Sequence, residues 1–204
     1  DLETICRGRD RPVIITVRPR REGGAWKGSE QQRLELLRRA AALGAEHIDV
    51  ELDSVTALGQ IAGHTQRIAS YHNFEETPAD LDAIHGELTA TGADVVKIAV
   101  RARDIAETPA VLRLPERHPD VPTIALSMGE EGIPTRVLAG RFGGYLTFAS
   151  AAPGREAADG QVPWREMTGL YRFSRIGPHS PLFGVVANPV AHSMSPAIHN
   201  AAFA

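Results

Sequence analysis

The stretch Asp94-Val95-Val96-Lys97-Ile98-Ala99-Val100 places one lysine inside an otherwise apolar and mostly β-branched run. Side chains alternate along a β-strand, so the odd-numbered residues, Lys97 among them, share one face and the even-numbered residues share the other. The even-numbered face carries the bulkier β-branched side chains and suits packing against helices. We therefore expect a strand buried on both faces, with Lys97 pointing to the inside.

Similar apolar runs recur along the chain, at residues 13–17, 47–52, 67–71, 122–126 and 145–149. Helical patterns lie between most of them. Ser29 can cap one helix that ends at Gly44, and Thr77-Pro78-Ala79-Asp80 predicts a cap with Pro78 at the first helical position. A third, weaker helix is expected over residues 103–114. This order of strands and helices is typical of βα units around a parallel sheet.

The strands are not followed by the glycine-rich fingerprint of a dinucleotide-binding fold, so a barrel is preferred to a doubly wound sheet. A complete (β/α)8 TIM barrel has eight strands and about 250 residues. Six strands are expected before residue 150, which predicts an α/β TIM barrel that lacks its first two strands. A long loop over 151–161, a helix over 164–173 and a linker over 174–181 follow, and a new strand is expected at 182–187.

Composition excludes several classes of protein. The 204 residues include 22 Lys+Arg and 25 Asp+Glu, and a net charge of −3 argues against nucleic acid or an anionic membrane as a partner. An apolar content of 43% is enough for a core. The sequence has no membrane-length apolar run and no signal segment. The single cysteine, Cys6, excludes a disulfide framework and predicts a cytoplasmic protein. Because the chain opens on Asp1 and stops at Ala204, we expect both ends to be cut.

Lys97 is one of only two lysines, with Lys27, among the 22 basic residues. Burying an ammonium group is costly, which favours the neutral amine and hence a nucleophile. The alternative is a structural ion pair with a barrel carboxylate such as Glu51. Both interpretations stay open on the pattern alone.

His72 ends the strand at 67–71, where active-site groups of barrels gather, and an imidazole can give and take protons near neutral pH. Arg18 and Glu22 follow the first strand, where they could hold a carboxylate and orient an imidazole. For His72 the alternative is a hydrogen-bonded loop residue, and for Arg18 and Glu22 it is a charged, solvated loop.

Arg136 follows the strand at 122–126 and is expected to open a helix, an unfavourable place for a cation unless a substrate anion lies nearby. The alternative is an ordinary surface arginine. The carboxylates of Glu51 and Asp53 could bind a metal, but they have no companion ligands at a clear spacing, so no metal site is predicted.

Taken in order, these segments resemble type I 3-dehydroquinate dehydratase, the Schiff-base lyase of the shikimate pathway, over residues 1–173. The matching motifs are Ile15-Thr16-Val17-Arg18-Pro19, Glu22-Gly23-Gly24, Ile48-Asp49-Val50-Glu51-Leu52, Ser70-Tyr71-His72-Asn73-Phe74, Val96-Lys97-Ile98-Ala99, Met128-Gly129 and Gly132-Ile133-Pro134-Thr135-Arg136.

The resemblance implies that Lys97 forms an imine with the ketone of 3-dehydroquinate, that His72 is the general acid and base, and that Glu22 supports His72. It implies no metal and no cofactor for this reaction. The expected partner is this small-molecule substrate, and a homodimer is the candidate assembly. The family begins with two further strands, so we expect impaired or absent turnover by this chain.

The resemblance further implies that Arg18 and Arg136 bind substrate oxygens, Arg136 chiefly the carboxylate. It also implies that Met128 lines the pocket and that Gln161 closes a lid loop. The family often has Ser-Ala-Pro-Gly-Gln in that loop, whereas this chain has Ala-Ala-Asp-Gly-Gln at 157–161. The lid serine is therefore absent.

Residues 182–204 resemble the start of shikimate dehydrogenase. Ser195 is expected to cap a helix with Pro196 at its first position, and Ser193 and Ser195 match serines that bind the substrate carboxylate. The NADP site of such a dehydrogenase would lie beyond Ala204, so the reduction is not expected here. The predicted domains are 1–173, a linker at 174–181, and the fragment at 182–204. The rival hypotheses are another Schiff-base aldolase and a non-catalytic remnant.

Overall fold

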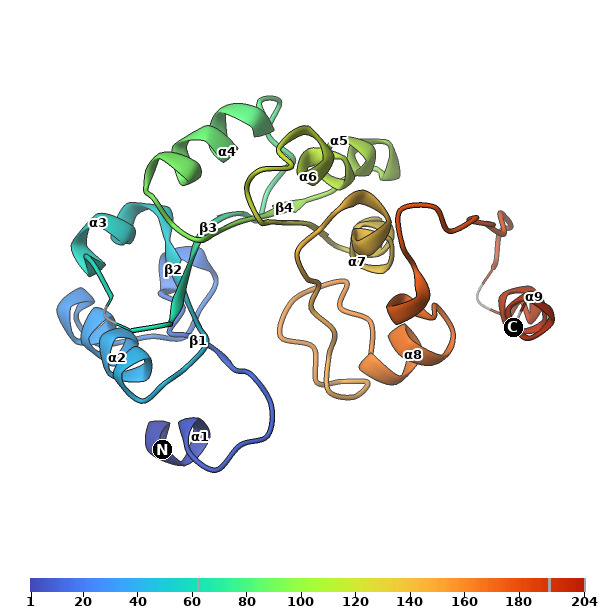
Figure 1. Ribbon diagram of the computed structural model, residues 1–204. Coiled ribbons are helices and arrows are strands. Elements are labelled where there is room, and N and C mark those ends of the chain that lie inside the picture. The colour runs from blue at the N-terminus through green and yellow to red at the C-terminus, as the bar shows by residue number, and fades with distance from the viewer. Residues whose placement is uncertain (62, 191, 204) are drawn as a thin grey trace.

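A computed structural model describes residues 1–61, 63–190 and 192–203 of the chain. Its centre is a parallel five-stranded sheet in the order β1-β2-β3-β4-β5, each strand pairing with the next in sequence. The strands are β1 (Ile14–Thr16), β2 (His47–Glu51), β3 (Gln66–Asn73), β4 (Val95–Arg101) and β5 (Thr123–Met128). The sheet curves, with helices along its convex side, as Figure 1 shows.

The helices on the convex side are α2 (Glu30–Ala42), α3 (Val55–Leu58), α4 (Leu81–Ala90), α5 (Thr108–Leu112) and α6 (Leu114–Arg117). The remaining helices are α1 (Leu2–Cys6), α7 (Ile133–Val137), α8 (Trp164–Gly169) and α9 (Ser195–Ala202). Short 3-10 turns are η1 (Arg20–Glu22), η2 (Leu52–Ser54), η3 (Ile105–Glu107), η4 (Ala139–Phe142) and η5 (Phe173–Arg175).

The predicted helix starts are confirmed in one case and shifted in another. Ser29 caps α2 through a reciprocal capping box with Gln32, which satisfies backbone donors that the helix leaves free. In the next long helix, α4, Asp80 is the cap and accepts from the backbone nitrogen of Ala83, so Pro78 lies before the helix rather than at its first position.

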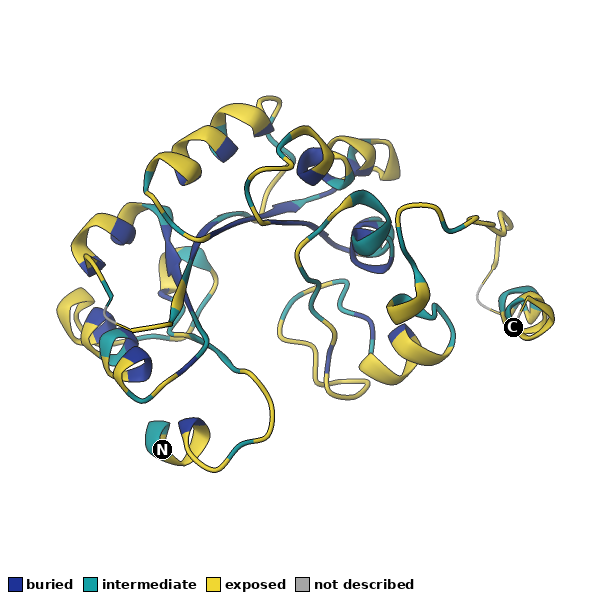
Figure 2. Ribbon diagram, viewed as in Figure 1, coloured by how far each residue is buried: buried dark blue, intermediate teal, exposed yellow. Residues whose placement is uncertain are grey.

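Alternation along β4 divides the core into two layers. The even-numbered residues of β4 pack with the outer helices in one cluster, and Val95 packs with Ile68, Ile124 and Leu126 on the concave side in another. The dark blue along the strands in Figure 2 shows that their residues are buried. The orientation predicted for Lys97 is therefore confirmed.

The sixth predicted strand, at residues 145–149, is not a strand. The segment begins with one backbone hydrogen bond to β5, from the Tyr145 nitrogen to the Thr123 oxygen at 2.9 Å, and ends at an isolated bridge between Ser150 and Pro163. Leu146 and Phe148 still pack on the concave cluster. The segment 145–149 is thus apolar because it packs on the concave cluster, although it forms no ladder of backbone hydrogen bonds with a strand.

Two predicted helices are shorter than expected. Residues 103–114 form η3, α5 and the beginning of α6, and both α5 and α6 have proline in their first positions. Proline lacks the backbone donor, so it starts a new helical segment more readily than it continues an old one. The helix expected over 164–173 ends at Gly169.

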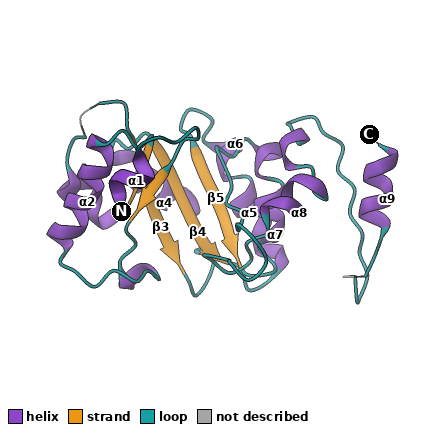
Figure 3. Ribbon diagram, turned by 90° about the horizontal axis from the view of Figure 1, so that it is seen from below, coloured by secondary structure: helices purple, strands orange, loops and turns teal. Residues whose placement is uncertain are grey.

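The predicted strand at 182–187 is absent, and these residues are exposed and irregular. Helix α9 follows, with Met194 rather than Ser195 in the cap position and no side-chain capping bond. The Asn200 side chain donates to the backbone oxygen of Leu170, at the end of α8. Figure 3 shows the long connection that leads to α9.

Within the described residues, no helix combines the length and apolar character needed to span a bilayer.

Candidate active site

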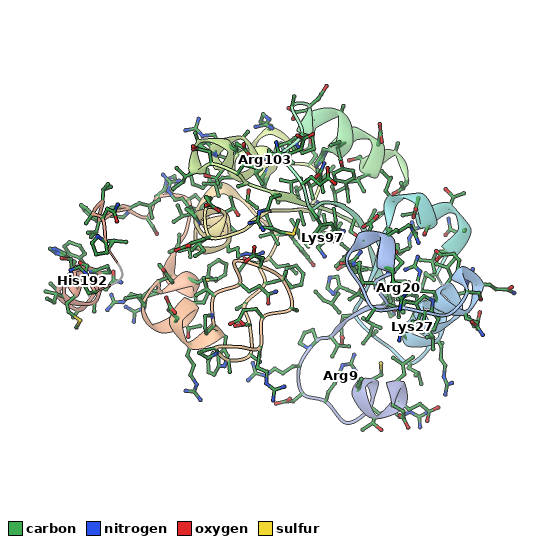
Figure 4. All side chains as sticks on the ribbon, turned by 180° about the vertical axis from the view of Figure 1, so that it is seen from behind. Arg9, Arg20, Lys27, Lys97, Arg103 and His192 are labelled. Carbon is green, nitrogen blue, oxygen red and sulfur yellow. The ribbon has the colours of Figure 1, made fainter. Side chains whose placement is uncertain are left out.

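The concave face of the sheet carries polar side chains at the carboxyl ends of its strands. Parallel pairing aligns Glu51 of β2 with Ser70 of β3, and Ser70 with Lys97 of β4. Alternation adds Asp49 and His72 to the same face. Figure 4 places Lys97 near the middle of the molecule and Lys27 toward its edge, on the side of α2.

Lys97 is 8% exposed, and its Nζ donates to Asp49 Oδ2 at 2.7 Å. Arg18 donates to the other oxygen of Asp49 at 2.8 Å. Burial opposes ionisation of this carboxyl, but the charges of Lys97 and Arg18 outweigh it and hold the pKa of Asp49 below its usual range. Lys97 thus forms an ion pair with a barrel carboxylate, as one of the two interpretations had it, but the carboxylate is Asp49, the preceding inward residue of β2, rather than the Glu51 named as an example.

Glu51 instead lies between two arginines from opposite sides of the sheet. It accepts from Arg18 at 2.7 Å, and it forms an ion pair with Arg33 of the outer helix α2 at 2.5 Å. Both Glu51 and Arg33 are 0% exposed. Burial raises the pKa of Glu51 in spite of these charges. Arg33, which also donates to the Val17 backbone oxygen, therefore joins the outer helix α2 to the carboxyl ends of β1 and β2.

His72 is oriented by Glu22, as predicted, with 2.7 Å between its Nδ1 and Glu22 Oε2. The loop after β1 brings Glu22 to this place through a close turn. This turn requires glycine at residue 24, because a Cβ there would lie 1.9 Å from the Arg18 carbonyl oxygen. The Phe74 ring stacks on the imidazole at a centroid distance of 6.0 Å. Burial lowers the pKa of His72, and the hydrogen bond to Glu22 opposes this effect.

His72 and Lys97 are neighbours on the concave face. His72 pairs in register with Ala99, and Lys97 lies one inward position earlier on β4. The charge of Lys97 further lowers the pKa of His72. The Phe148 ring centroid lies 5.0 Å from Lys97 Nζ and covers it from the 145–149 segment. An imidazole and an amine thus lie on neighbouring strands of the same face.

Arg136 is 2% exposed and lies in the last turn of α7, so the prediction that it opens a helix was wrong. It donates to the backbone oxygen of Asp159 at 3.2 Å, and its Nε is buried without a hydrogen-bond partner among the described residues. Burial lowers the pKa of Arg136 to about 10. A buried cation with a free donor is suited to bind an anion. Met128, 5% exposed, ends the adjacent strand β5.

The other predicted site residues lie apart from this group or face elsewhere. Gln161 accepts from the backbone nitrogen of Ala157 at 2.8 Å, within its own loop. Ser193 and Ser195 lie at the start of α9, where the Ser193 hydroxyl accepts from the Ser195 nitrogen at 3.3 Å. Asp53 pairs with Arg21 near the surface at 2.7 Å. The described part of the chain holds no group of three His, Cys, Asp or Glu that could bind a metal.

Asp49, Ser70 and Arg33 belong to the site but were not predicted as site residues. Asp49 could have been found, because it precedes Glu51 by two residues and must share its face. Ser70 follows from the register in the same way. Arg33 gave no such signal, since a charged residue on a helix is usually solvated.

Comparisons with known proteins identify the family to which the chain is similar. The model of the type I 3-dehydroquinase family matches residues 2–178. The 3-dehydroquinate dehydratase of Methanococcus vannielii is 40% identical over 161 residues, which cover 74% of this chain and 72% of that protein. The solved 3-dehydroquinate dehydratase from Geobacillus kaustophilus superposes with a TM-score of 0.70 at 25% identity, over 76% of this chain and 65% of that one.

Two longer relatives match the chain beyond residue 178. The chloroplastic bifunctional 3-dehydroquinate dehydratase/shikimate dehydrogenase of Arabidopsis thaliana is 41% identical over 210 residues, with all of this chain aligned to 35% of that protein. The dehydroquinate dehydratase and shikimate dehydrogenase structure from S. pombe covers 98% of this chain, and 39% of its own, with a TM-score of 0.69 at 26% identity. This chain thus spans about a third of the length of the bifunctional relatives.

The family model covers most of the chain, and the relatives and the solved structure are 3-dehydroquinate dehydratases. The fold, a parallel α/β sheet with a lysine and a histidine on its concave face, is consistent with them. The chain therefore belongs to the type I 3-dehydroquinate dehydratase family, whose members are lyases.

Proposed function

We propose that this chain carries the dehydratase site for the conversion of 3-dehydroquinate to 3-dehydroshikimate through an imine on Lys97. The observation that carries the proposal is the pairing of Lys97 with Asp49 and of His72 with Glu22 on one face of the sheet, each at 2.7 Å. Membership of the family supports the substrate, and the geometry supports the roles.

In the proposed reaction, the Lys97 amine adds to the substrate ketone, and loss of water gives a protonated imine. The imine accepts the electron pair of an adjacent C–H bond, so that proton becomes acidic enough for an imidazole to remove. His72 takes the proton and then donates it to the departing hydroxyl, which leaves as water. Hydrolysis releases the product and restores Lys97. Glu22 fixes the imidazole and stabilises its charged form.

Two arginines, the buried Arg136 and the partly buried Arg18, are proposed to bind the substrate. Arg136, with its unpartnered Nε, is suited to the carboxylate, and Arg18 to a substrate hydroxyl. Met128 would form part of the pocket wall, and Gln161 would reach the substrate after its loop rearranges. No metal or cofactor enters this scheme.

Residues 182–204 are proposed to be the first part of a shikimate dehydrogenase substrate domain, joined by the linker at 174–181. The matches to bifunctional relatives across the whole chain support this proposal. Ser193 and Ser195 would bind the shikimate carboxylate. The NADP-binding part would lie in other residues, so this chain would not carry out the reduction.

Borohydride reduction in the presence of 3-dehydroquinate tests the mechanism. We expect a substrate adduct on Lys97 in peptide mass analysis. Lys97→Arg keeps the charge beside Asp49 but cannot form the imine, and should abolish the adduct, whereas Lys27→Arg should leave it unchanged. An adduct with an aldolase substrate instead would favour the aldolase hypothesis. Absence of any adduct would favour a non-catalytic remnant.

The role of His72 is separable from that of Lys97. His72→Ala should still give the borohydride adduct on Lys97, because the amine is intact, but should lose dehydration by a factor of about 10² to 10⁴. Product formation is followed by the absorbance of the new conjugated double bond. Retained turnover would refute the assignment of the acid and base.

A further inference from the structure

The loop over residues 151–162 is fixed at its base and held at one point beyond it. The base is closed by backbone hydrogen bonds from the Ser150 nitrogen to Val162 and from the Trp164 nitrogen to Ser150, at 3.0 and 2.9 Å. Beyond the base, Asp159 makes contacts to the ends of two strands and to α7. These contacts determine where the far part of the loop lies.

The side chain of Asp159 binds Arg101, the last residue of β4, with 2.5 Å between Oδ2 and Nη1. Its backbone oxygen accepts from the Gly129 nitrogen at 3.4 Å and from Arg136 Nη2 at 3.2 Å. One residue thus joins the loop to β4, to the end of β5 and to the buried cation of the candidate site.

The neighbouring backbone is shaped for this contact. A Cβ on Gly160 would lie 2.1 Å from the Gly129 oxygen, and the positive φ of 76° at Gly160 also favours glycine. A Cβ on Gly129 would come within 3.3 Å of the Arg101 guanidinium carbon. Arg101 and Glu131 therefore both lie against Gly129, and the loop can approach the Gly129 backbone this closely because Gly160 lacks a side chain.

We propose that Arg101 and Asp159 form a latch that holds the 151–162 loop over Arg136 and neutralises the Asp159 charge beside the place where a substrate carboxylate binds. This inference rests on the proposed function and makes both residues positioning residues rather than catalytic ones. Without Arg101, the Asp159 carboxylate would repel an anionic substrate from Arg136. Their side chains are 38% and 62% exposed, so the latch can open and close at little cost.

Loop opening can be measured without turnover, because Arg155 lies exposed in the loop and trypsin can cut after it. In the full chain, Arg101→Gln should accelerate this cut, and Asp159→Asn should do the same. The double variant should be cut no faster than the faster single variant, since both changes break one contact. Arg103→Gln is the matched control, because Arg103 follows the same strand but pairs with Glu76 at 3.4 Å.

Steady-state kinetics with 3-dehydroquinate tests the charge effect. Arg101→Gln should raise KM about two- to fivefold with little change in kcat, the size of effect expected for a half-exposed ion pair. Adding Asp159→Asn to it should lower KM again, and Arg101→Lys should retain most of the wild-type value. Rescue of this kind is not expected if Arg101 only supports the fold.

The outcomes separate the latch from the proposed function. If Arg101→Gln and Arg103→Gln have the same rate of tryptic cleavage and the same KM, the latch hypothesis is wrong. Dehydration by the wild type would in that case still support the proposed function. If the wild type gives neither product nor an adduct on Lys97, but cleavage follows the expected pattern, the latch stands as a device of the loop and the proposed function fails.

Discussion

The charged side chains around Lys97 are arranged so that groups of opposite charge lie side by side. Asp49 holds the lysine and is itself held by Arg18, while Glu22 holds the imidazole, and Ser70 supports Asp49 by donating to it at 2.8 Å. Around Lys97 each of these charges lies beside one of opposite sign, which is the condition under which buried charges are tolerated. The reacting groups are thereby fixed before substrate enters.

Removal of the Glu22 charge should shift the pH dependence of the site. The hydrogen bond to Glu22 raises the pKa of His72 against the effect of burial. In Glu22→Gln the pKa of His72 should therefore fall further, so that the imidazole stays neutral to lower pH. We expect the acid limb of kcat/KM to move to lower pH, with a lower maximum because the charged imidazole is less stable. NMR titration of the His72 ring measures the same shift directly, and an unchanged or raised pKa would contradict it.

The strands carry Asp49, His72 and Lys97, and the segments that follow the strands complete the site. The η1 loop after β1 delivers Glu22, the 145–149 segment delivers Phe148, and α7 delivers Arg136. The η1 loop in particular depends on a close backbone contact that glycine permits, rather than on a regular hydrogen-bond ladder. Substitution of such a glycine should therefore affect function more than substitution of a glycine in a helix.

Two glycine-to-alanine variants test this with opposite signs. In Gly24→Ala the new methyl group would overlap the Arg18 carbonyl oxygen at 1.9 Å, so the loop must move; we expect a lower melting temperature and reduced dehydratase activity. Gly86 lies exposed within α4, and a methyl group added there would meet no atom within 4 Å, so Gly86→Ala should stabilise by about 0.5–1 kcal/mol. Thermal unfolding compares the two, and equal effects would refute the argument.

For the molecule as a whole, a buried histidine outside the site links stability to pH. His85 of α4 is 2% exposed and stacks on His118 at a centroid distance of 3.9 Å. Its Nε2 lies 2.9 Å from the Thr123 hydroxyl at the start of β5. Burial lowers the pKa of His85 to about 4, with the charge of His118 adding to the effect, Asp82 opposing it and Arg117 adding a little more.

A histidine with a depressed pKa binds its proton more tightly in the unfolded chain, where the value is about 6.5. Its contribution to stability is complete above pH 6.5 and is lost as the pH falls through about 4. We expect the free energy of unfolding to decline over this interval, and His85→Gln to flatten the decline. Urea unfolding at a series of pH values measures it. The neighbouring Asp82, whose pKa is lowered by its hydrogen bonds to Arg117 and His118, would retain a weaker slope in the variant.

The support of His72 by Glu22 was implied by the family resemblance, whereas the sequence by itself determined the parallel α/β architecture and the inward direction of Lys97. These follow from local rules: alternation along a strand, capping residues, and the gathering of strand ends at one edge. Where a prediction failed, as at residues 145–149 and 182–187, an apolar run indicated a strand, but a strand also needs a neighbour to complete its hydrogen bonds.

Only the tertiary structure decided which charges meet. Asp49 rather than Glu51 pairs with Lys97, Arg33 of the outer helix α2 pairs with Glu51 at the end of β2, and Asp159 binds Arg101 across 58 residues of sequence. Spacing along the chain leaves many such pairs open, because partners far apart in sequence are selected by strand register, by loop closure and by the need of each buried charge for a neighbour of opposite sign.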